Sequence, residues 1–360
     1  MERRLARAPR RALVIKLGHI GDVLVTTPVI AALHRAFPGV EVTAVVNQGT
    51  EDMLRHNPQV SRLRVVRRDL KGLAGLAEQA GLLAGLWREH FDLSLELSGG
   101  DRGAWLSLAG RAKLRVGFEP KKPHMRARAF HLLVDQRGTQ DHVVRTFLRQ
   151  IRAIGVEPSD DRLRFEPGPA ARHEVARLLA DHGLRPGRYV ALHPTSRWMF
   201  KSWTPEGNAA VAEHLLGLGL DVALSAAPAP AEMAFVARLK DILGPRPGLV
   251  DLSGRLDLLG LGALIDGARL FFGVDSAPMH MAAALGRPTA VLFGPSGEKM
   301  WGPWRVESEV ITGDCPQRPC GRDGCDGSKI SRCLVEIAPA RVCQALDGLL
   351  ARTESSCASA

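Results

Sequence analysis

The segment 193–203, "HPTSRWMFKSW", gathers the kinds of side chain that bind phosphate groups. Thr195 and Ser196 supply hydroxyls and Lys201 supplies an ammonium group, directly after the apolar run 189–192. Hydroxyls and a lysine that converge at the end of a buried strand suit a phosphate or a diphosphate. The alternative is an amphipathic loop whose aromatic side chains cover the core, and the two interpretations are compatible.

A second segment, "FFGVDSAPMHMAAALG" at 271–286, predicts the start of a helix that faces an anion. The strand ends at Val274, Asp275 and Ser276 begin the helix, and His280 falls in its first turn. Free backbone N–H groups and the positive end of the helix dipole attract negative charge. Capping by Asp275 and Ser276, and a structural role for His280, remain open as alternatives.

Neither segment contains paired carboxylates spaced to hold a divalent metal. The lysine, the hydroxyls and the helix dipole are therefore predicted to stabilise a diphosphate without an obligatory metal ion. A metal-free diphosphate site suggests group transfer from an activated donor.

The third segment, "LGHIGDVLVTTP" at 17–28, marks a turn from a strand into a helix. Gly18 and Gly21 have the spacing G-x-x-G, so they do not form the dinucleotide fingerprint G-x-G-x-x-G. Glycines at such a turn allow the backbone to approach a ligand closely. Asp22 follows them and is a candidate general base, with helix capping as the alternative.

Apolar strand-type runs alternate with helical stretches along the chain, which indicates parallel sheets covered on both faces. The predicted strands are 12–17, 40–46, 62–66, 91–97, 114–118, 131–135, 189–193, 221–225, 249–253, 269–274 and 288–294. The predicted helices are 22–37, 49–57, 141–155, 204–219, 231–244, 256–268, 277–286 and 339–352. The Pro-, Asp- and Arg-rich stretch 157–174 interrupts this alternation and predicts a linker.

We therefore expect two doubly wound α/β domains, 1–165 and 175–335, with ligands bound at the carboxyl ends of the strands. A last helix, 336–352, is expected to pack back on the first domain.

The composition is that of an ordinary globular protein, with 45% hydrophobic and 24% charged residues among 360. No stretch approaches the ~18–20 apolar residues of a membrane-spanning helix, so we expect a cytoplasmic protein.

The whole net charge of +10 lies in residues 1–170, which hold 28 Lys and Arg against 18 Asp and Glu. This excess fits an anionic membrane surface, a phosphorylated acceptor or a solvated face. A nucleic-acid binder is disfavoured because recognition-helix and zinc-finger patterns are missing from the sequence.

Four cysteines near the C-terminus have the spacing C-x₄-C-x₄-C-x₇-C. They are Cys315, Cys320, Cys325 and Cys333. Structural zinc sites usually use two C-x₂₋₄-C pairs. The first two intervals here reach the upper edge of that range, but the cysteines do not form two close pairs, so a zinc site is the minor hypothesis and a loop of reduced thiols the major one.

The three segments, in this order, resemble the ADP-heptose:lipopolysaccharide heptosyltransferases, which are inverting glycosyltransferases of family 9 with the GT-B fold. The similar stretches are "IKLGHIGDVLVTTPVIAALHRAFP", "HPTSRWMFKSWTPEGN" and "FFGVDSAPMHMAAALGRPTAVLFGPSG" followed by "WGPW", and the resemblance runs from about residue 12 to 350. It implies two Rossmann-like domains that face each other across a cleft. The segments 193–203 and "GGDRGAW" at 99–105 are most similar to the heptosyltransferase III branch.

The resemblance also implies roles for single residues. Asp22 matches the catalytic base, and Lys201 matches the lysine that neutralises the donor phosphates. The implied donor-binding residues are Thr195, Ser196, Asp275, Ser276, His280 and, after a turn without glycine at 225–232, Glu232. The implied acceptor-binding residues are Gly18, Gly21, Asp101, Arg102, Arg126 and Arg128, with Lys121 and Lys122 nearby.

In such an enzyme the donor substrate is ADP-heptose, no further cofactor is required, and domain closure assembles the site. The acceptor is a phosphorylated, lipid-linked core sugar at the cytoplasmic face of the inner membrane, which gives the basic first half a partner. The sequence leaves other interpretations open: transfer of the heptosyltransferase I or II type, transfer to protein or a capsular glycan, a two-domain nucleotide-sugar epimerase, or a binding module without activity.

Overall fold

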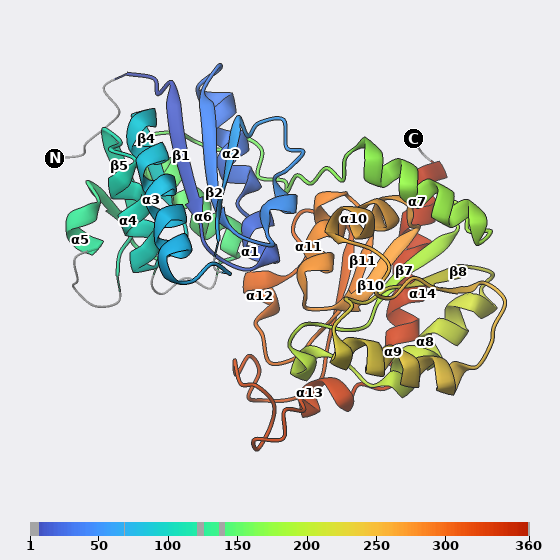
Figure 1. Cartoon of the computed structure of the whole chain (residues 1–360). Helices are drawn as coiled ribbons and strands as arrows, with labels where there is room; N and C mark the ends of the chain where they lie inside the picture. Colours follow the sequence, from blue (N-terminus) through green and yellow to red (C-terminus); the bar gives the residue numbers. More distant parts are fainter. Residues whose placement is uncertain (1–6, 68, 121–125, 137–140, 359–360) are drawn as a thin grey trace. The chain divides into compact units, whose positions relative to one another are not determined.

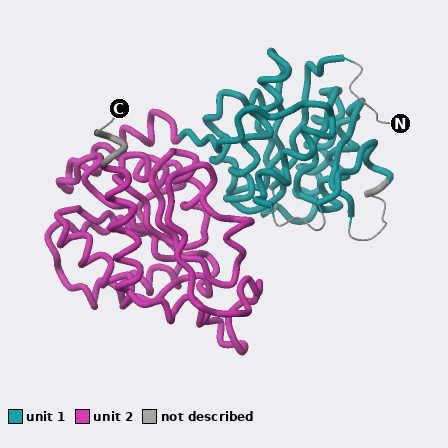
Figure 2. The backbone as a smooth tube through the Cα atoms, turned by 180° about the vertical axis from the view of Figure 1, so that it is seen from behind, with its two compact units in different colours: residues 1–166 teal, residues 167–360 magenta. Residues whose placement is uncertain are grey.

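The computed structural model describes residues 7–67, 69–120, 126–136 and 141–358 of the chain. The chain divides into two compact units, Met1–Glu166 and Pro167–Ala360 (Figure 2). No helix in the described ranges combines the length and the apolar character needed to cross a membrane.

The first unit is built on a six-stranded sheet in the order β3-β2-β1-β4-β5-β6, and every adjacent pair is parallel (Figure 1). Its strands are β1 (Arg11–Lys16), β2 (Glu41–Asn47), β3 (Arg62–Val66), β4 (Leu93–Glu96), β5 (Leu114–Phe118) and β6 (Leu132–Val134). The central strands are buried almost throughout because helices cover both faces, which explains their continuous apolar runs. All six carboxyl ends therefore lie at one edge of the sheet.

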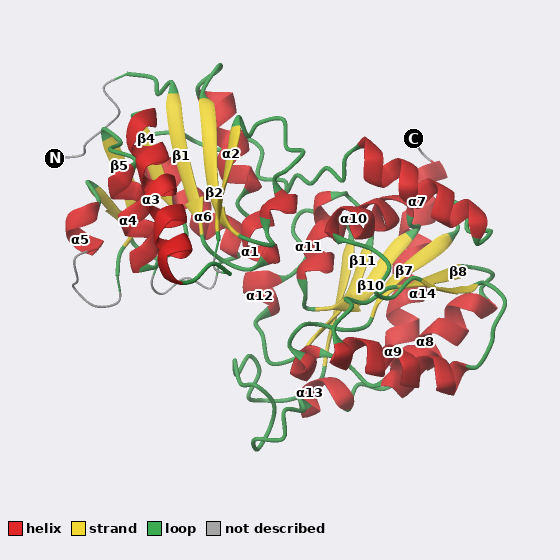
Figure 3. Cartoon of the chain, in the orientation of Figure 1, coloured by secondary structure: helices red, strands yellow, loops and turns green. Residues whose placement is uncertain are grey.

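Helices α2 and α6 pack together on one face of this sheet, and α3, α4 and α5 form a contacting series on the other (Figure 3). The helices are α1 (Ile20–Leu24), α2 (Thr27–Ala36), α3 (Gly72–Glu89), α4 (Asp101–Ala109), α5 (Arg126–Ala129) and α6 (Val143–Ala153), with a 3₁₀ turn η1 (Glu51–Met53).

The second unit repeats the design with the order β12-β11-β10-β7-β8-β9, again parallel throughout. Its strands are β7 (Tyr189–His193), β8 (Asp221–Leu224), β9 (Leu249–Asp251), β10 (Leu270–Val274), β11 (Thr289–Phe293) and β12 (Ser308–Thr312). Its helices are α7 (Pro169–Asp181), α8 (Pro205–Gly217), α9 (Pro230–Leu243), α10 (Leu258–Gly267), α11 (Ala277–Ala284), α12 (Glu298–Trp301), α13 (Arg332–Val335) and α14 (Pro339–Ala358), with a 3₁₀ turn η2 (Met199–Lys201).

The C-terminal helix differs from the expectation in both length and placement. Predicted for 336–352 and expected on the first domain, it is α14 in the structure and packs against α8, β11 and β12 of its own unit. Val342, Leu346 and Leu349 are fully buried in the core of that unit, so the apolar face of α14 is used there.

Five other elements also depart from the prediction. The helix predicted for 49–57 is only the short turn η1. Gly49 has a φ of 80°, outside the helical region, and Pro58 disfavours helical backbone at residue 57, so neither end of the predicted range is helical. Helices α3 and α4 and strand β12 are not among the predicted elements. Helix α7 begins at Pro169, inside the stretch expected to be a linker.

Candidate active site

Asp22 lies at the carboxyl edge of the first sheet, on the short helix α1 that follows β1. Its Oδ2 accepts a hydrogen bond from the backbone N–H of His19 at 2.9 Å. This contact is the capping role considered for Asp22, and it holds the carboxylate in one orientation. Oδ1 points to a different partner, Lys16.

Lys16 is a buried cation beside Asp22 that sequence reasoning missed. Its Nζ lies 3.5 Å from Asp22 Oδ1 and donates a hydrogen bond to the Leu97 carbonyl at 3.2 Å. Burial lowers the pKa of Lys16, and the carboxylates of Asp22 and Glu96 oppose that shift. The available signal was a single lysine at the end of an otherwise apolar strand, "ALVIK".

Gly18 is required by the position of Asp22. A Cβ atom built on Gly18 would lie 2.6 Å from the Asp22 Cβ, a separation that side chains do not tolerate. The Gly18 carbonyl accepts a hydrogen bond from Asn47 Nδ2 at 3.1 Å, which ties the turn to the end of β2. The close backbone approach predicted at this glycine is thus made by Asp22 of the same chain. Gly21 lies within α1, where its carbonyl accepts the N–H of Val25.

The predicted acceptor residues do not all lie near Asp22. Asp101 and Arg102 begin α4 directly after β4, and because β4 pairs in parallel with β1 they share the carboxyl edge with Asp22. Arg128 lies in α5, next to the start of β5, where Arg115 Nε donates to the Ala129 carbonyl at 2.7 Å. That position is toward the amino edge, so the structure separates Arg128 from Asp22.

The remaining basic acceptor candidates are Lys121, Lys122 and Arg126. Lys121 and Lys122 lie outside the described residues, and so does the side chain of Arg126.

At its own carboxyl edge, the second unit joins the two segments that were predicted to bind phosphate. Strands β7 and β10 are adjacent and parallel, so the loops that follow them meet. Lys201 Nζ in η2 lies 2.7 Å from Asp275 Oδ2 at the start of the α11 segment. The lysine and the helix terminus predicted from separate motifs therefore belong to one cluster.

Thr195 and Glu232 form a second buried contact in this cluster. The Thr195 hydroxyl donates to Glu232 Oε2 at 2.6 Å, and both side chains are buried. The same carboxylate oxygen accepts the N–H of Ala227 at 3.4 Å. The Thr195 hydroxyl hydrogen is thus donated to Glu232. Ser196 Oγ accepts a hydrogen bond from the N–H of Trp198 at 3.3 Å.

Helix α11 has Ser276 as its N-cap, and the Ser276 side chain makes no capping hydrogen bond to the first amides. Ser276 Oγ donates instead to the Val274 carbonyl at 3.2 Å, so capping by this hydroxyl does not occur. His280 is buried in the first turn and meets the Trp301 ring edge-on, with the centroids 6.4 Å apart. An uncapped helix terminus beside Lys201 provides N–H donors suited to an anion.

His193 is the last residue of β7, directly before the loop that carries Thr195, Ser196 and Lys201, and was not among the predicted site residues. Burial lowers its pKa to about 4, so the imidazole is neutral at physiological pH. Its Nδ1 lies 3.0 Å from Ser225 Oγ. The first letter of "HPTSRWMFKSW" was the available signal, because histidine is uncommon inside an apolar strand.

The cysteine segment between β12 and α14 gives no support to the zinc hypothesis. Cys333 is buried, and Cys315, Cys320 and Cys325 are partly buried free thiols. Within the described part of the chain, no group of three or more His, Cys, Asp or Glu side chains is arranged to hold a metal ion. Burial is the main factor that raises the pKa of Cys333 to about 11, which favours the neutral thiol.

Comparison with known proteins identifies the family. Residues 81–330 match the model of glycosyltransferase family 9, described as heptosyltransferase. Lipopolysaccharide heptosyltransferase 3 of Escherichia coli is 31% identical over 334 residues, which cover 92% of this chain and 96% of that protein. Lipopolysaccharide heptosyltransferase 1 of Pseudomonas aeruginosa is 26% identical, with coverage of 96% and 99%.

Solved structures show the same fold. The glycosyl transferase family 9 structure from Veillonella parvula has a TM-score of 0.82 at 21% identity and covers 95% of this chain and 97% of its own. ADP-heptose lps heptosyltransferase II of E. coli has a TM-score of 0.77 at 19% identity, with coverage of 96% and 99%. The predicted α/β fold of two doubly wound parallel sheets, the GT-B type, is confirmed.

Proposed function

The chain belongs to glycosyltransferase family 9, and from this premise we propose that it transfers heptose from ADP-heptose to a phosphorylated inner-core acceptor of lipopolysaccharide. Similarity to the E. coli heptosyltransferase 3 over almost the whole of both chains supports this donor and this branch. The transfer inverts the configuration at the anomeric carbon and requires no metal ion.

The observation that carries the proposal is the Lys201–Asp275 pair at the carboxyl ends of β7 and β10. A lysine held 2.7 Å from a buried carboxylate is fixed in place beside the first amides of α11. A diphosphate leaving group gains charge as its bond to the sugar breaks. Lys201 and the helix terminus would stabilise that charge, which is the part a divalent metal plays in other transferases.

Asp22 is proposed as the general base. Its carboxylate takes the proton from the acceptor hydroxyl, and the hydroxyl oxygen forms a bond to the anomeric carbon of the donor. The bond between that carbon and the diphosphate oxygen breaks on the opposite face, and the electron pair leaves with ADP. Asp22 lies outside the segment that matches the family model, so the contacts of Asp22 with His19 and Lys16 are its main structural support.

The other donor contacts follow from the same cluster. Ser196, Ser276 and His280 are proposed to contact the diphosphate and the sugar. Glu232 is proposed to contact the nucleoside, and Thr195 would orient it through the 2.6 Å hydrogen bond.

The acceptor is proposed to be lipid-linked, and the protein to act as a peripheral enzyme at the cytoplasmic face of the inner membrane. The first half carries the whole basic excess of the chain, 28 Lys and Arg against 18 Asp and Glu in residues 1–170. Asp101 and Arg102 at the start of α4 are the candidates for acceptor contacts because they share a sheet edge with Asp22.

The test is incubation of the purified protein with ADP-heptose, UDP-sugars or GDP-sugars, together with truncated core acceptors. We expect ADP release and an acceptor whose mass increases by one heptose. Isomerised sugar nucleotide from a reaction without acceptor would instead indicate an epimerase. Transfer to a protein or a capsular glycan, but not to a core acceptor, would replace the proposed acceptor.

A further inference from the structure

Helix α3 is apolar and yet exposed along most of its length. Among residues 72–87, "GLAGLAEQAGLLAGLW", the only polar side chains are Glu78 and Gln79. Leu73 and Leu76 are 86% and 65% exposed. A helix that is apolar on all sides is normally buried in a core or in lipid, so this exposure calls for a partner.

The exposed surface continues into a groove between α3 and α4. The groove has a volume of about 530 Å³ and is lined by Leu83, Trp87, Arg88, Trp105 and Leu108, with alanines between them. Both tryptophans are exposed there. We refer to Leu73, Leu76 and this groove together as the α3–α4 surface.

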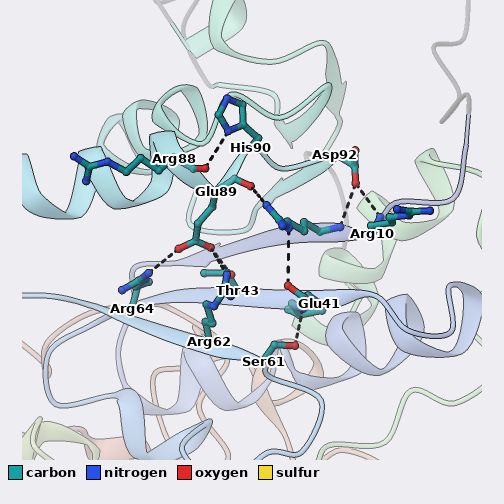
Figure 4. Close-up of polar contacts among 12 residues, drawn as sticks. Arg10, Glu41, Thr43, Ser61, Arg62, Arg64, Arg88, Glu89, His90 and Asp92 are labelled. Atoms are coloured by element: carbon teal, nitrogen blue, oxygen red, sulfur yellow. Dashed lines mark hydrogen bonds and ion pairs between the residues drawn. The ribbon is translucent and has the colours of Figure 1, made fainter.

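The C-terminal end of α3 is fastened to the sheet, so the α3–α4 surface has a fixed support. Glu89 is buried and accepts hydrogen bonds from Arg64 at 2.7 Å and from the Thr43 hydroxyl at 3.0 Å (Figure 4). Its carbonyl accepts a third hydrogen bond, from Arg11, at 2.6 Å. The exposed leucines lie at the opposite end of the helix, where only Gly75 is buried among residues 71–80.

Cations border the apolar area. Arg88 lines the groove, the Arg111 guanidinium lies 4.8 Å from the centre of the Trp87 ring, and Lys71 precedes the helix. Glu78 is the single acidic residue in the exposed part of α3. Tryptophan, leucine and basic side chains together are characteristic of helices that lie in the headgroup region of a membrane.

The α3–α4 surface begins at the sheet edge that carries Asp22. Helix α3 follows β3, and β3 runs parallel to β2 and β1, so the first turns of α3 lie at the carboxyl edge of the sheet. An acceptor anchored in a membrane would reach Asp22 from that edge.

We propose that the α3–α4 surface docks on an anionic lipid bilayer, with Leu73, Leu76 and the two tryptophans among the acyl chains and Arg88 and Arg111 at the phosphates. The helix lies in the interface and does not cross the membrane. The inference rests on the proposed function because it assumes a lipid-linked acceptor. What it adds is the surface of the protein that contacts the lipid.

The test is cosedimentation of the intact protein with vesicles of phosphatidylglycerol and phosphatidylcholine, without nucleotide or acceptor. The double variant Leu73→Ser/Leu76→Ser is expected to bind at least tenfold more weakly, because two apolar side chains that leave water on docking are replaced by polar ones. Leu218→Ser/Ile242→Ser, which alters two exposed apolar residues of the second unit, is the matched control and should bind like the original protein.

Charge is tested separately with Arg88→Glu/Arg111→Glu. This variant should lose affinity for phosphatidylglycerol vesicles by tenfold or more and lose most of its sensitivity to salt, because two cations beside the lipid phosphates become anions. All variants should transfer sugar to a soluble truncated acceptor as the original protein does. If the original protein does not transfer sugar to that acceptor, the proposed function is refuted. The vesicle experiment still tests the docking surface in that case, because it uses neither nucleotide nor acceptor.

Three outcomes would overturn the inference. The first is vesicle binding by the leucine variant equal to that of the control, and the second is no vesicle binding by the original protein. The third is a dimer of the original protein in analytical ultracentrifugation that the leucine variant converts to a monomer, without any binding to vesicles, which would make a second copy of the chain the occupant.

Discussion

Each unit pairs a lysine with an aspartate at the carboxyl edge of its sheet, but the more buried member of the pair differs between the two units. In the first unit the lysine is the more buried partner, with side-chain exposures of 9% for Lys16 and 20% for Asp22. In the second unit the aspartate is the more buried one, with 23% for Lys201 and 9% for Asp275. In both pairs the more exposed member is the one assigned to the chemistry.

This inversion follows from the charge each half must handle. A base needs a carboxylate that substrate reaches, and the buried Lys16 ammonium compensates the carboxylates of Asp22 and Glu96 around it. A diphosphate needs a cation that substrate reaches, and the buried Asp275 carboxylate holds the Lys201 ammonium in position at 2.7 Å. Under the proposed mechanism, the buried member of each pair is a positioning residue.

The largest expected effect is that of Asp22→Asn. Transfer should fall by ~10²–10⁴, the usual contribution of a general base, because an amide does not take the acceptor proton. The affinity for ADP should not change, since the proposed donor contacts lie in the second unit. Single-turnover transfer and calorimetric ADP titration measure the two quantities.

The matched variant for that experiment is Asp275→Asn, which removes the supporting carboxylate of the other pair. It should lose less activity than Asp22→Asn. If Asp22→Asn turns over like the original protein, the base assignment is refuted. The proposed link between the exposure of a pair member and its chemical role is then refuted as well.

The next effect is that of Lys201→Ala, which should lower transfer by ~10²–10³ and weaken ADP binding, because the charge on the leaving group loses its cation. Its counterpart Lys16→Met should act mainly on stability. The buried carboxylates would lose their compensating charge, at a cost of about 1–3 kcal/mol in the free energy of unfolding. Urea denaturation and ADP titration of both variants test the contrast; weaker ADP binding by Lys16→Met with unchanged stability would contradict it.

The sequence alone predicted much of the second unit's cluster. Lys201, Asp275 and Ser276 follow apolar strands directly, and in a doubly wound sheet those strand ends share one edge. Thr195 and Glu232 were both donor-binding candidates, but the hydrogen bond between them was not predicted, because side-chain partners are not determined by strand order.

The first unit was less predictable for a physical reason. A lysine at the end of an apolar strand is a weak signal, and the Leu97 carbonyl and the Phe147 ring, which contact Lys16 in the structure, come from distant segments. Helix α3 was missed because glycine and alanine are spread through an apolar sequence, which gives no amphipathic period. The surface proposed to meet lipid is therefore visible only in the folded structure.

The smallest expected effect concerns pH and His193, the buried neutral group at the end of β7. Its pKa falls from 6.5 to about 4 on folding, so the unfolded chain takes up a proton first as the solution is acidified. This contribution to stability is complete above pH 6.5 and decreases as the pH falls from 6.5 toward 4. Between pH 6.5 and 5 the second unit should lose about 2 kcal/mol.

The first unit provides the contrast in the same experiment. The pKa of its Asp160 is lowered to about 2, chiefly by the hydrogen bond from Arg162, so the stability that this carboxylate contributes is lost only below pH 3.8. Hydrogen exchange at pH 6.5 and 5, corrected for intrinsic rates, should show weaker protection in β7 and β10 but not in β1 and β2. His193→Asn should abolish the difference, because the asparagine side chain does not titrate; an unchanged loss in that variant would assign the acid sensitivity to another group.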